Sequence, residues 1–284
     1  MATVMNKKDK YINRTILYIG YVLISFIFVF PMWYMFISSI KPDAQIVRDM
    51  STIRAFIPSS NIAIENYIDI VNKVKFFKFF KNSAIVSVAS IAGATIINAM
   101  IGYSLGMLNF KGKRLIVSLM LALAIVPTEA VIINRFLVAF QLGMINSYVG
   151  LALPLIAYPM YIFLYYKHFQ GMPKELMEAA KVDGESYSGI FWNIMLPLSK
   201  PICTTVAMMA FIRSWGDLLW PSLVTRDESF RTLPLALRAL STDVYVYWGQ
   251  IFAFTSLMTL PVLIVFLLFQ KQFIQSLAMT GIKG

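Results

Sequence analysis

The sequence is poor in the residue types that carry out catalysis and bind metals. It has one cysteine and one histidine in 284 residues. A single cysteine excludes an intrachain disulfide framework and a cysteine-rich metal site, and we expect Cys203, which lies in an apolar stretch, to be inert packing. His168 follows Lys167 and suits a membrane interface better than a catalytic or ligand role.

Three catalytic and nucleotide-binding motifs are also missing from the sequence. Without H-E-x-x-H or G-x-S-x-G there is no evident zinc site or histidine-assisted nucleophile, so a membrane enzyme is disfavoured. Without G-x-x-x-x-G-K-[ST] the chain cannot cradle nucleotide phosphates as P-loop proteins do. We expect no catalytic residue, no bound cofactor and no bound metal.

Charged residues are scarce, and apolar residues dominate. The chain is 58% hydrophobic and 14% charged, against about 25% charged residues in soluble proteins, and its mean hydropathy is +0.69. The net charge of +11 comes from cations at the ends of apolar runs, not on one compact face. This distribution indicates contact with membrane lipid and not with nucleic acid.

Apolar runs of the length needed to cross a bilayer, about 20 residues, predict an all-α integral membrane protein with six transmembrane helices. The predicted spans cover residues 15–40, 83–108, 115–134, 148–166, 201–221 and 249–270. The first run is too long for a cleaved signal sequence, so we expect it to be retained. An even number of spans places both termini on one side.

The segments around the second span have distinct compositions. The loop over 41–82 is polar enough to leave the membrane, and its end, KVKFFKFFK over 73–81, predicts an interfacial helix with phenylalanines in lipid and lysines at the phosphates. Small and polar residues of the second span allow close helix packing. We therefore expect that span to face the helix bundle.

A few polar residues inside the spans are candidates for a translocation path: Asn98, Glu129, Arg213, Trp215 and Asp217. Glu129 follows Pro127, which interrupts the third span, and it fits a path residue and an interfacial carboxylate equally. Arg213 and Asp217 are four residues apart, so on a helix they would share one face. That pair fits either the path or a structural ion pair near the outer interface.

One polar stretch, residues 178–197, separates two long apolar regions and reads EAAKVDGESYSGIFWNIMLP. We expect a short helix over 174–182, a turn at Asp183-Gly184 and a second helical stretch before Pro197. The spacing E-A-A-x3-G-x9-I-x-L-P resembles the cytoplasmic coupling loop of permease subunits from ABC-type importers. The matched positions and their neighbour in the turn are Glu178, Ala179, Ala180, Asp183, Gly184, Ile194, Leu196 and Pro197.

Resemblance to the carbohydrate-uptake branch of these permeases, in particular to the smaller permease subunit of the maltose importer, extends over nearly the whole chain. The further matching stretches are residues 215–221, 232–235, 260–263 and the ending at 273–284. Gly216 departs from the asparagine usual after the tryptophan in that family. The resemblance implies a type I ABC importer permease fold in the cell membrane.

The resemblance also implies partners and a mechanism. The expected assembly is a heterodimer of two permeases with two ATPase subunits, which use ATP and Mg, and an extracytoplasmic substrate-binding protein. Glu178 would offer a carboxylate to a basic residue of the ATPase, while Leu176, Met177 and Ala180 would fill its cleft. Gly184 would permit the sharp turn.

The sequence also suggests boundaries and an orientation. The expected parts are an N-terminal helix and loop (1–82), a permease core (83–270) and a cytoplasmic tail (271–284). Cations favour the inner side only weakly, so cytoplasmic termini are expected from the basic turn at 111–114 and from the resemblance.

The substrate class stays open at this point. A sugar or oligosaccharide is expected from the resemblance, and glycerol phosphate is an alternative for the same permease role. An ion-coupled secondary transporter is the alternative from another mechanistic class. It would need Glu129, Arg213 or Asp217 as coupling groups, and the inverted repeats common in such folds are not evident.

Overall fold

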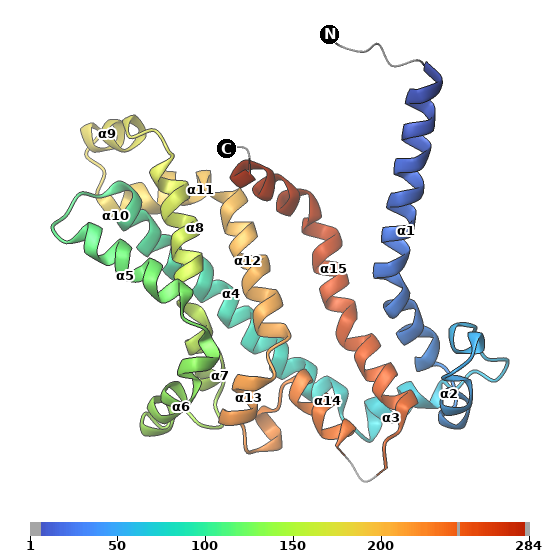
Figure 1. The fold of residues 1–284 in the computed structure, drawn as a ribbon. Coiled ribbons are helices and arrows are strands. Elements are labelled where there is room, and N and C mark those ends of the chain that lie inside the picture. Colours follow the sequence, from blue (N-terminus) through green and yellow to red (C-terminus); the bar gives the residue numbers. More distant parts are fainter. Residues whose placement is uncertain (1–6, 243–244, 282–284) are drawn as a thin grey trace. The chain divides into compact units, whose positions relative to one another are not determined.

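The computed structural model describes residues 7–242 and 245–281, and its side chains over 14–242 and 245–270. The described residues form helices and connecting turns, with no strand among them (Figure 1). In chain order the elements are α1 (Lys7–Ser39), α2 (Asp43–Asp49), η1 (Ile53–Phe56), α3 (Glu65–Asn72), α4 (Phe76–Met107), α5 (Lys113–Ile125), η2 (Thr128–Val131), α6 (Ile132–Gln141), α7 (Tyr148–Ile156), α8 (Pro159–Gln170), α9 (Glu175–Val182), α10 (Tyr187–Ile190), η3 (Phe191–Met195), α11 (Leu196–Leu198), α12 (Lys200–Trp215), α13 (Leu219–Val224), η4 (Glu228–Phe230), α14 (Leu233–Ser241) and α15 (Trp248–Gly281).

Three helices are long and apolar enough to cross a membrane alone, and three bent helix pairs complete a set of six candidate spans. The long spans are Arg14–Ser39, Phe76–Met107 and Trp248–Gln270. The bent pairs are Lys113–Ile125 with Thr128–Gln141 (97°), Tyr148–Ile156 with Pro159–Gln170 (44°) and Tyr187–Leu198 with Lys200–Trp215 (81°). Three of the expected spans are therefore single long helices, and the other three correspond to bent pairs. The expected fifth span, 201–221, differs from the structure, because α12 ends at Trp215.

Proline accounts for the position of these breaks. Pro127 precedes η2, Pro159 is the first residue of α8, and Pro201 stands in the first turn of α12. Proline has no backbone N–H to donate and disfavours helix in the residue before it, but it fits the first turn of a new helix. Each bent pair therefore has a proline at its break or in the first turn of the helix that follows the break.

The chain forms two compact units, and the first comprises residues 1–75 and 240–259. Within it, Lys41 is only 1% exposed. Its Nζ donates hydrogen bonds to the Arg54 and Ala55 carbonyls at 2.6 and 3.0 Å and lies 3.8 Å from Asp49 Oδ2. Because a buried charge is tolerated only when it is paired and hydrogen-bonded, Lys41 fixes the loop that follows α1.

The second unit comprises residues 76–239 and 260–284, and α4 is its centre. α4 packs against α7, α8 and α12, and its polar face is buried, with Ser87, Ser90 and Asn98 at most 2% exposed. The Ser214 hydroxyl of α12 donates to Ser87 Oγ at 3.0 Å. The expectation that this span faces the bundle is confirmed.

The structure corrects the expected interfacial helix over 73–81. Residues from Phe76 onward are the first turns of α4, and Phe76 and Phe79 are buried at 3% and 4% exposure. They pack within the protein because the helix continues without a break. The suggested division of the chain stays a prediction, and its boundary at 82–83 lies inside α4. Of the suggested tail, residues 282–284 lie outside the described residues.

Candidate functional site

The polar stretch 178–197 folds as two helical segments joined by a tight turn. α9 covers its first part, and α10, the π-helical segment η3 and the short α11 cover its second part, before an 81° bend into α12. The helix expected over 174–182 and the second helical stretch are both confirmed. The π-helical turn was not expected, and such turns in helices occur frequently at functional sites.

The turn is a Schellman motif that ends α9. Gly184 N–H donates to the Lys181 carbonyl and Glu185 N–H to the Ala180 carbonyl, both at 3.0 Å, which satisfies carbonyls left open at the helix end. Gly184 has φ +87°, and a Cβ added there would meet no atom within 4 Å. The backbone angle, and not crowding, therefore favours glycine at this position.

The side chains of α9 divide between solvent and the helix bundle. Glu178, Ala179 and Asp183 are exposed. Ala180 is 5% exposed and belongs to the hydrophobic core of the second unit, so it cannot fill a partner's cleft as the sequence suggested. Its small side chain instead lets α9 lie close to its own bundle.

The second half of the polar stretch supplies most of the packing. Ile190, Phe191 and Met195 are at most 3% exposed, while Ile194 and Leu196 are half-buried against the same core. The residues therefore divide by role, and those from Ile190 onward hold the stretch in place. Pro197 is exposed at its end.

An aromatic cluster joins the polar stretch to α4 and α8. The ring centroid of Tyr103 lies 5.7 Å from that of Phe169 and 5.4 Å from that of Phe191. The Tyr103 hydroxyl donates to the Tyr187 carbonyl at 3.3 Å. Aromatic pairs at these distances stabilise beyond the area they bury, so α4, α8 and the stretch are connected by one continuous contact.

Two glycines allow α4 and α8 to approach closely beside this cluster. A Cβ added to Gly102 would lie 2.4 Å from Tyr165 Cβ and 2.9 Å from the backbone nitrogen of Tyr166, and one added to Gly106 would lie 2.7 Å from Phe169 Cβ. This contact was not among the features expected from the sequence. The signal was present as G-Y-S-L-G over 102–106, the G-x-x-x-G pattern of tight helix pairs in membranes.

His168 connects the end of α8 to the bend before α12. Its Nε2 lies 3.1 Å from Ser199 Oγ. Because the Ser199 hydroxyl donates its one hydrogen to the Met195 carbonyl at 2.6 Å, we assign the hydrogen of this contact to His168 Nε2. The lone histidine is thus a partly buried hydrogen-bond donor, and its expected place at a membrane interface stays a prediction.

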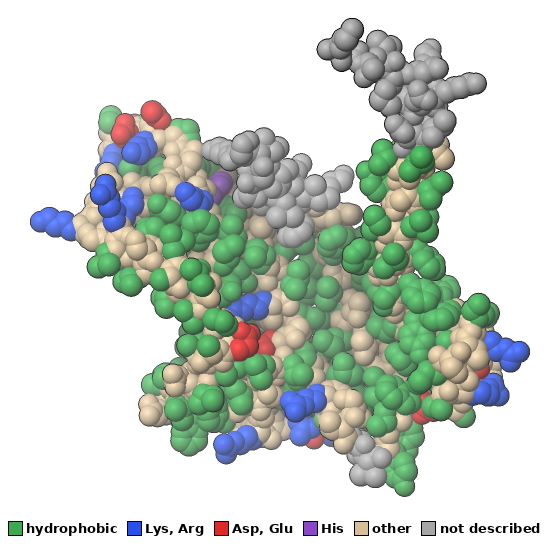
Figure 2. All heavy atoms as spheres, in the orientation of Figure 1, with side chains coloured by type: hydrophobic (Ala, Val, Ile, Leu, Met, Phe, Trp, Pro, Cys, Tyr) green, Lys and Arg blue, Asp and Glu red, His purple; other side chains and the backbone are tan. Residues whose placement is uncertain are grey.

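A second polar region gathers at the breaks in the spans. Glu129 is in η2, Arg135 in α6, Arg213 in the last turn of α12, and Asp217 follows that helix. Arg135 is within electrostatic range of the other three charges. Figure 2 shows a patch of acidic and basic side chains within the hydrophobic surface of the second unit. Two carboxylates and two guanidinium groups thus form one cluster, the charge cluster.

The structure corrects the expected pairing of Arg213 with Asp217. α12 ends at Trp215, so the two residues do not share a helix face, and they form no ion pair among the described side chains. Asp217 Oδ1 accepts the Trp220 backbone N–H at 3.2 Å. The Arg213 guanidinium lies 4.0 Å from the Tyr158 ring centroid, and its Nη1 is buried without a hydrogen-bond partner.

Asn98 and Trp215, two candidates for the translocation path, are both buried among protein groups. Asn98 is fully buried, donates to the Ala94 and Ile156 carbonyls at 2.6 and 2.8 Å, and accepts the Tyr158 N–H at 3.1 Å. It therefore satisfies the backbone at the break between α7 and α8, as such breaks require in lipid. Trp215 is 4% exposed and packs on Phe211, with ring centroids 5.4 Å apart.

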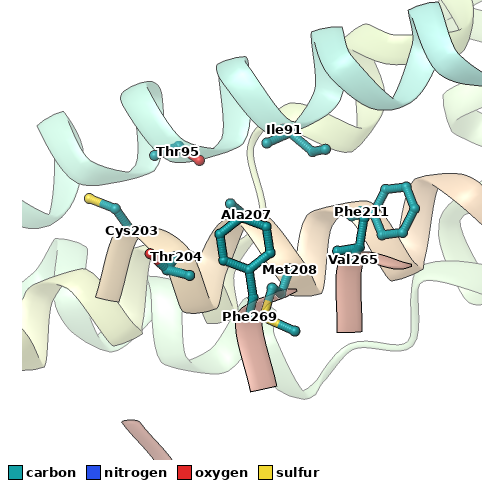
Figure 3. Close-up of a pocket in the computed structure, with 9 residues that line it drawn as sticks. All are labelled: Ile91, Thr95, Cys203, Thr204, Ala207, Met208, Phe211, Val265 and Phe269. Carbon is teal, nitrogen blue, oxygen red and sulfur yellow. The ribbon is translucent and has the colours of Figure 1, made fainter. Parts of the chain in front are cut away.

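A cavity of about 380 Å³ lies among α4, α12 and α15 (Figure 3). Its lining is mostly apolar, with Thr95, Cys203 and Thr204 as the polar exceptions. Thr95 Oγ1 is buried without a hydrogen-bond partner. Cys203 is part of an apolar wall, which agrees with the packing role expected from the sequence.

These observations define an all-helical membrane protein with broken spans and a structured loop between α8 and α12. The family of binding-protein-dependent transport system inner membrane components matches residues 98–279. The chain belongs to this family. It is therefore a multi-pass permease of the inner-membrane component type, and the ion-coupled alternative is not favoured.

Relatives match along the whole length. The chain is 32% identical to the arabinooligosaccharides transport system permease protein AraQ of Halalkalibacterium halodurans, covering 99% of this chain and 100% of that protein. It is 29% identical to the trehalose/maltose transport system permease protein MalG of Thermococcus litoralis, covering 98% and 99%. It is 29% identical to the sn-glycerol-3-phosphate transport system permease protein UgpE of Brucella abortus, covering 95% and 96%.

A solved structure shows the same fold. It is the crystal structure of a bacterial ABC transporter involved in the import of the acidic polysaccharide alginate, with a TM-score of 0.80 and 21% identity, covering 95% of this chain and 100% of that chain. The expected ABC importer permease fold is confirmed.

Proposed function

We propose that this chain is one of two permease subunits of an ATP-driven importer, and that residues 178–197 dock on an ATPase subunit. The observation that carries the proposal is the division of that stretch into exposed and buried residues. Glu178, Ala179 and Asp183 are exposed on α9, while Ile190 and Phe191 are buried in the bundle. A segment that is held by buried residues and still presents an exposed helix to solvent can bind a partner without losing its position in the bundle.

The chemistry of the stretch supports transmission and not catalysis. Glu178 in the first half of α9 offers a carboxylate to a basic partner residue. The turn at Gly184 is fixed by two backbone hydrogen bonds, so the exposed helix cannot swing freely. Movement of the ATPase is passed through the aromatic cluster to α4 and α8, which shifts the bundle between inward- and outward-open states. ATP and Mg are bound by the ATPase.

The charge cluster is the polar part of the proposed translocation path. Charged side chains in a membrane almost always face a wet cavity or a protein partner, and broken helices with polar groups at the break are typical of transport sites. Glu129, Arg213 and Asp217 line the path, and Arg135 joins them. Asn98 and Trp215 support the fold behind it.

The proposed assembly contains a second permease, two ATPase subunits and an extracytoplasmic binding protein that delivers a sugar or oligosaccharide. The names of the AraQ and MalG relatives support this substrate class. The UgpE relative makes sn-glycerol-3-phosphate the second candidate. Identification of the ligand that co-purifies with the cognate binding protein decides between them. In the proposed orientation the 178–197 stretch and both termini are cytoplasmic.

The docking role is tested with Glu178→Lys. We expect the ATPase subunit to be lost from the purified complex, because reversal of the charge replaces an attraction by a repulsion. Glu175→Lys is the matched control, since Glu175 is also exposed in the first turn of α9. Equal recovery of the ATPase with both variants would contradict the proposed contact at Glu178.

A further inference from the structure

The turn between α4 and α5 contains a polar pocket of about 340 Å³ that the proposed function does not use. Asn109, Phe110, Gly112, Lys113 and Arg114 line it. Gly112 has φ +85°, a left-handed conformation that glycine adopts without strain, and this turns the chain sharply into α5. The pocket thus brings two cations and an aromatic ring together at the start of a membrane span.

The positive charge of this pocket is not balanced by the protein. Lys113 and Arg114 stand in the first turn of α5, which has no acidic residue, and cations at a helix N-terminus are unfavourable because that end is itself positive. Lys174, beside α9, is within electrostatic range of Lys113. Among the described side chains, none of Lys111, Lys113, Arg114 and Lys174 forms an ion pair with a carboxylate.

Lys113 is nevertheless held in a fixed position. The Lys113 Nζ donates one of its three hydrogens to the Leu108 carbonyl at 2.9 Å, so two hydrogens remain to bind a ligand. Lys113 and the exposed Arg114 line the same pocket, and a phosphate group accepts several charge-assisted hydrogen bonds from such cations.

The surface next to the pocket is apolar and exposed. Leu115, Ile116 and Leu119 of α5 are 64%, 46% and 54% exposed, and Phe110 is 42% exposed. Figure 2 shows basic side chains gathered at the end of the second unit that carries α9, next to a hydrophobic surface. The cations of the pocket therefore lie at the end of an exposed apolar helix face.

We propose that this pocket binds the phosphate group of an anionic phospholipid. Lys113 and Arg114 hold the phosphate, Lys174 adds to the positive potential, and the exposed face of α5 receives an acyl chain. Clusters of basic residues beside membrane helices attract anionic lipid headgroups. The exposed apolar residues favour a lipid over an acidic protein surface. The proposal does not depend on the docking role of residues 178–197, so the two can fail separately.

The test uses native mass spectrometry of the complete importer, titrated with dioleoyl phosphatidylglycerol or with dioleoyl phosphatidylcholine. We expect one phosphatidylglycerol to be retained selectively. Lys113→Gln with Arg114→Gln should weaken its binding about 25-fold, since each cation near a membrane surface contributes about fivefold. Arg48→Gln with Arg54→Gln, which removes two cations elsewhere, should leave the affinity unchanged.

A second variant and a second ligand keep the test decisive. Arg114→Gln with Lys174→Gln keeps the Lys113–Leu108 hydrogen bond, and it should also weaken phosphatidylglycerol binding. This variant replaces the first one in the test if the first does not assemble. Unchanged phosphatidylglycerol binding in these variants would overturn the proposal. Displacement of the lipid by millimolar inorganic phosphate would assign the pocket to a soluble anion. Loss of the ATPase with unchanged lipid binding would assign it to a protein partner.

Discussion

The 178–197 stretch and the charge cluster, both in the second unit, differ in how their side chains are packed. The stretch from α9 to α11 is held by buried aromatic and aliphatic side chains, with Phe169, Ile190 and Met195 all at 0% exposure. At the charge cluster, Glu129 is exposed and Arg213 and Asp217 are half-buried. One region is closely packed, whereas the other contains charges with unused hydrogen-bonding capacity.

This difference assigns different tasks to the two regions. A closely packed element moves as one body because packed interiors have low compressibility, so it can transmit a displacement. Charged groups beside helix breaks stay accessible to water or to a polar solute. We therefore expect substitutions in the packed region to lower the stability of the protein, and substitutions in the charge cluster to lower the transport rate.

The largest effect is expected where the helices touch at a glycine. Gly102→Ala places a methyl group 2.4 Å from Tyr165 Cβ and 2.9 Å from a backbone nitrogen, so α4 and α8 must separate. Overpacking of this kind costs about 1–3 kcal/mol, and we expect a lower unfolding midpoint of the purified complex in a thermal scan.

Gly20→Ala in α1 is the control for this substitution. No atom lies within 4 Å of a Cβ added to Gly20, and alanine favours helix over glycine by about 1 kcal/mol. The two variants should therefore shift the midpoint in opposite directions. A stabilised Gly102→Ala protein would show that α4 and α8 are not tightly packed there.

The next effect is expected in the polar region. Arg213→Gln removes a positive charge and the unpartnered Nη1 donor, and hydrogen bonds to charged groups contribute about 1.5–3 kcal/mol. We expect ATP-driven uptake in proteoliposomes to fall about tenfold or more, with the ATPase still bound. Arg226→Gln, in an exposed loop, serves as the control. Uptake at the wild-type rate would exclude Arg213 from the path.

The smallest effect is expected at the junction of α8 and α12. His168→Ala removes the hydrogen bond to Ser199, which costs about 1 kcal/mol, and His168→Gln can still donate one. We expect the alanine variant alone to lower the unfolding midpoint slightly. Identical midpoints for both variants and the wild type would show that the contact at 3.1 Å does not hold the junction.

Much of the fold follows from local sequence signals. Apolar runs predicted the six candidate spans, and Pro127 predicted one of the breaks, because both signals act through a few neighbouring residues. The turn at Gly184 was predictable for the same reason. The charge cluster was only partly predictable, since Arg135 joins it through tertiary structure and α12 ends before Asp217.

The remaining features depend on contacts between distant residues. The sequence does not show that the Asn98 side chain accepts the Tyr158 backbone N–H, about 60 residues away, at the break between α7 and α8. Nor does it show that Ala180 is buried in the bundle. The helix contact at Gly102 and Gly106 had a local signal, the G-x-x-x-G pattern. The partner of that face, α8, is defined only by the folded chain.

The central claim, that residues 178–197 couple ATP hydrolysis to transport, is tested most directly with Gly184→Asp. The change adds a carboxylate at an exposed turn. Gly184 has φ +87°, so a side chain there costs about 1–2 kcal/mol of backbone strain. Because the added Cβ meets no atom within 4 Å, we expect normal assembly. Gly143→Asp is matched in φ sign and free space. The measurement is substrate uptake per ATP hydrolysed in proteoliposomes. We expect a strong decrease for Gly184→Asp and none for Gly143→Asp. Wild-type uptake per ATP for Gly184→Asp would contradict the coupling role of residues 178–197.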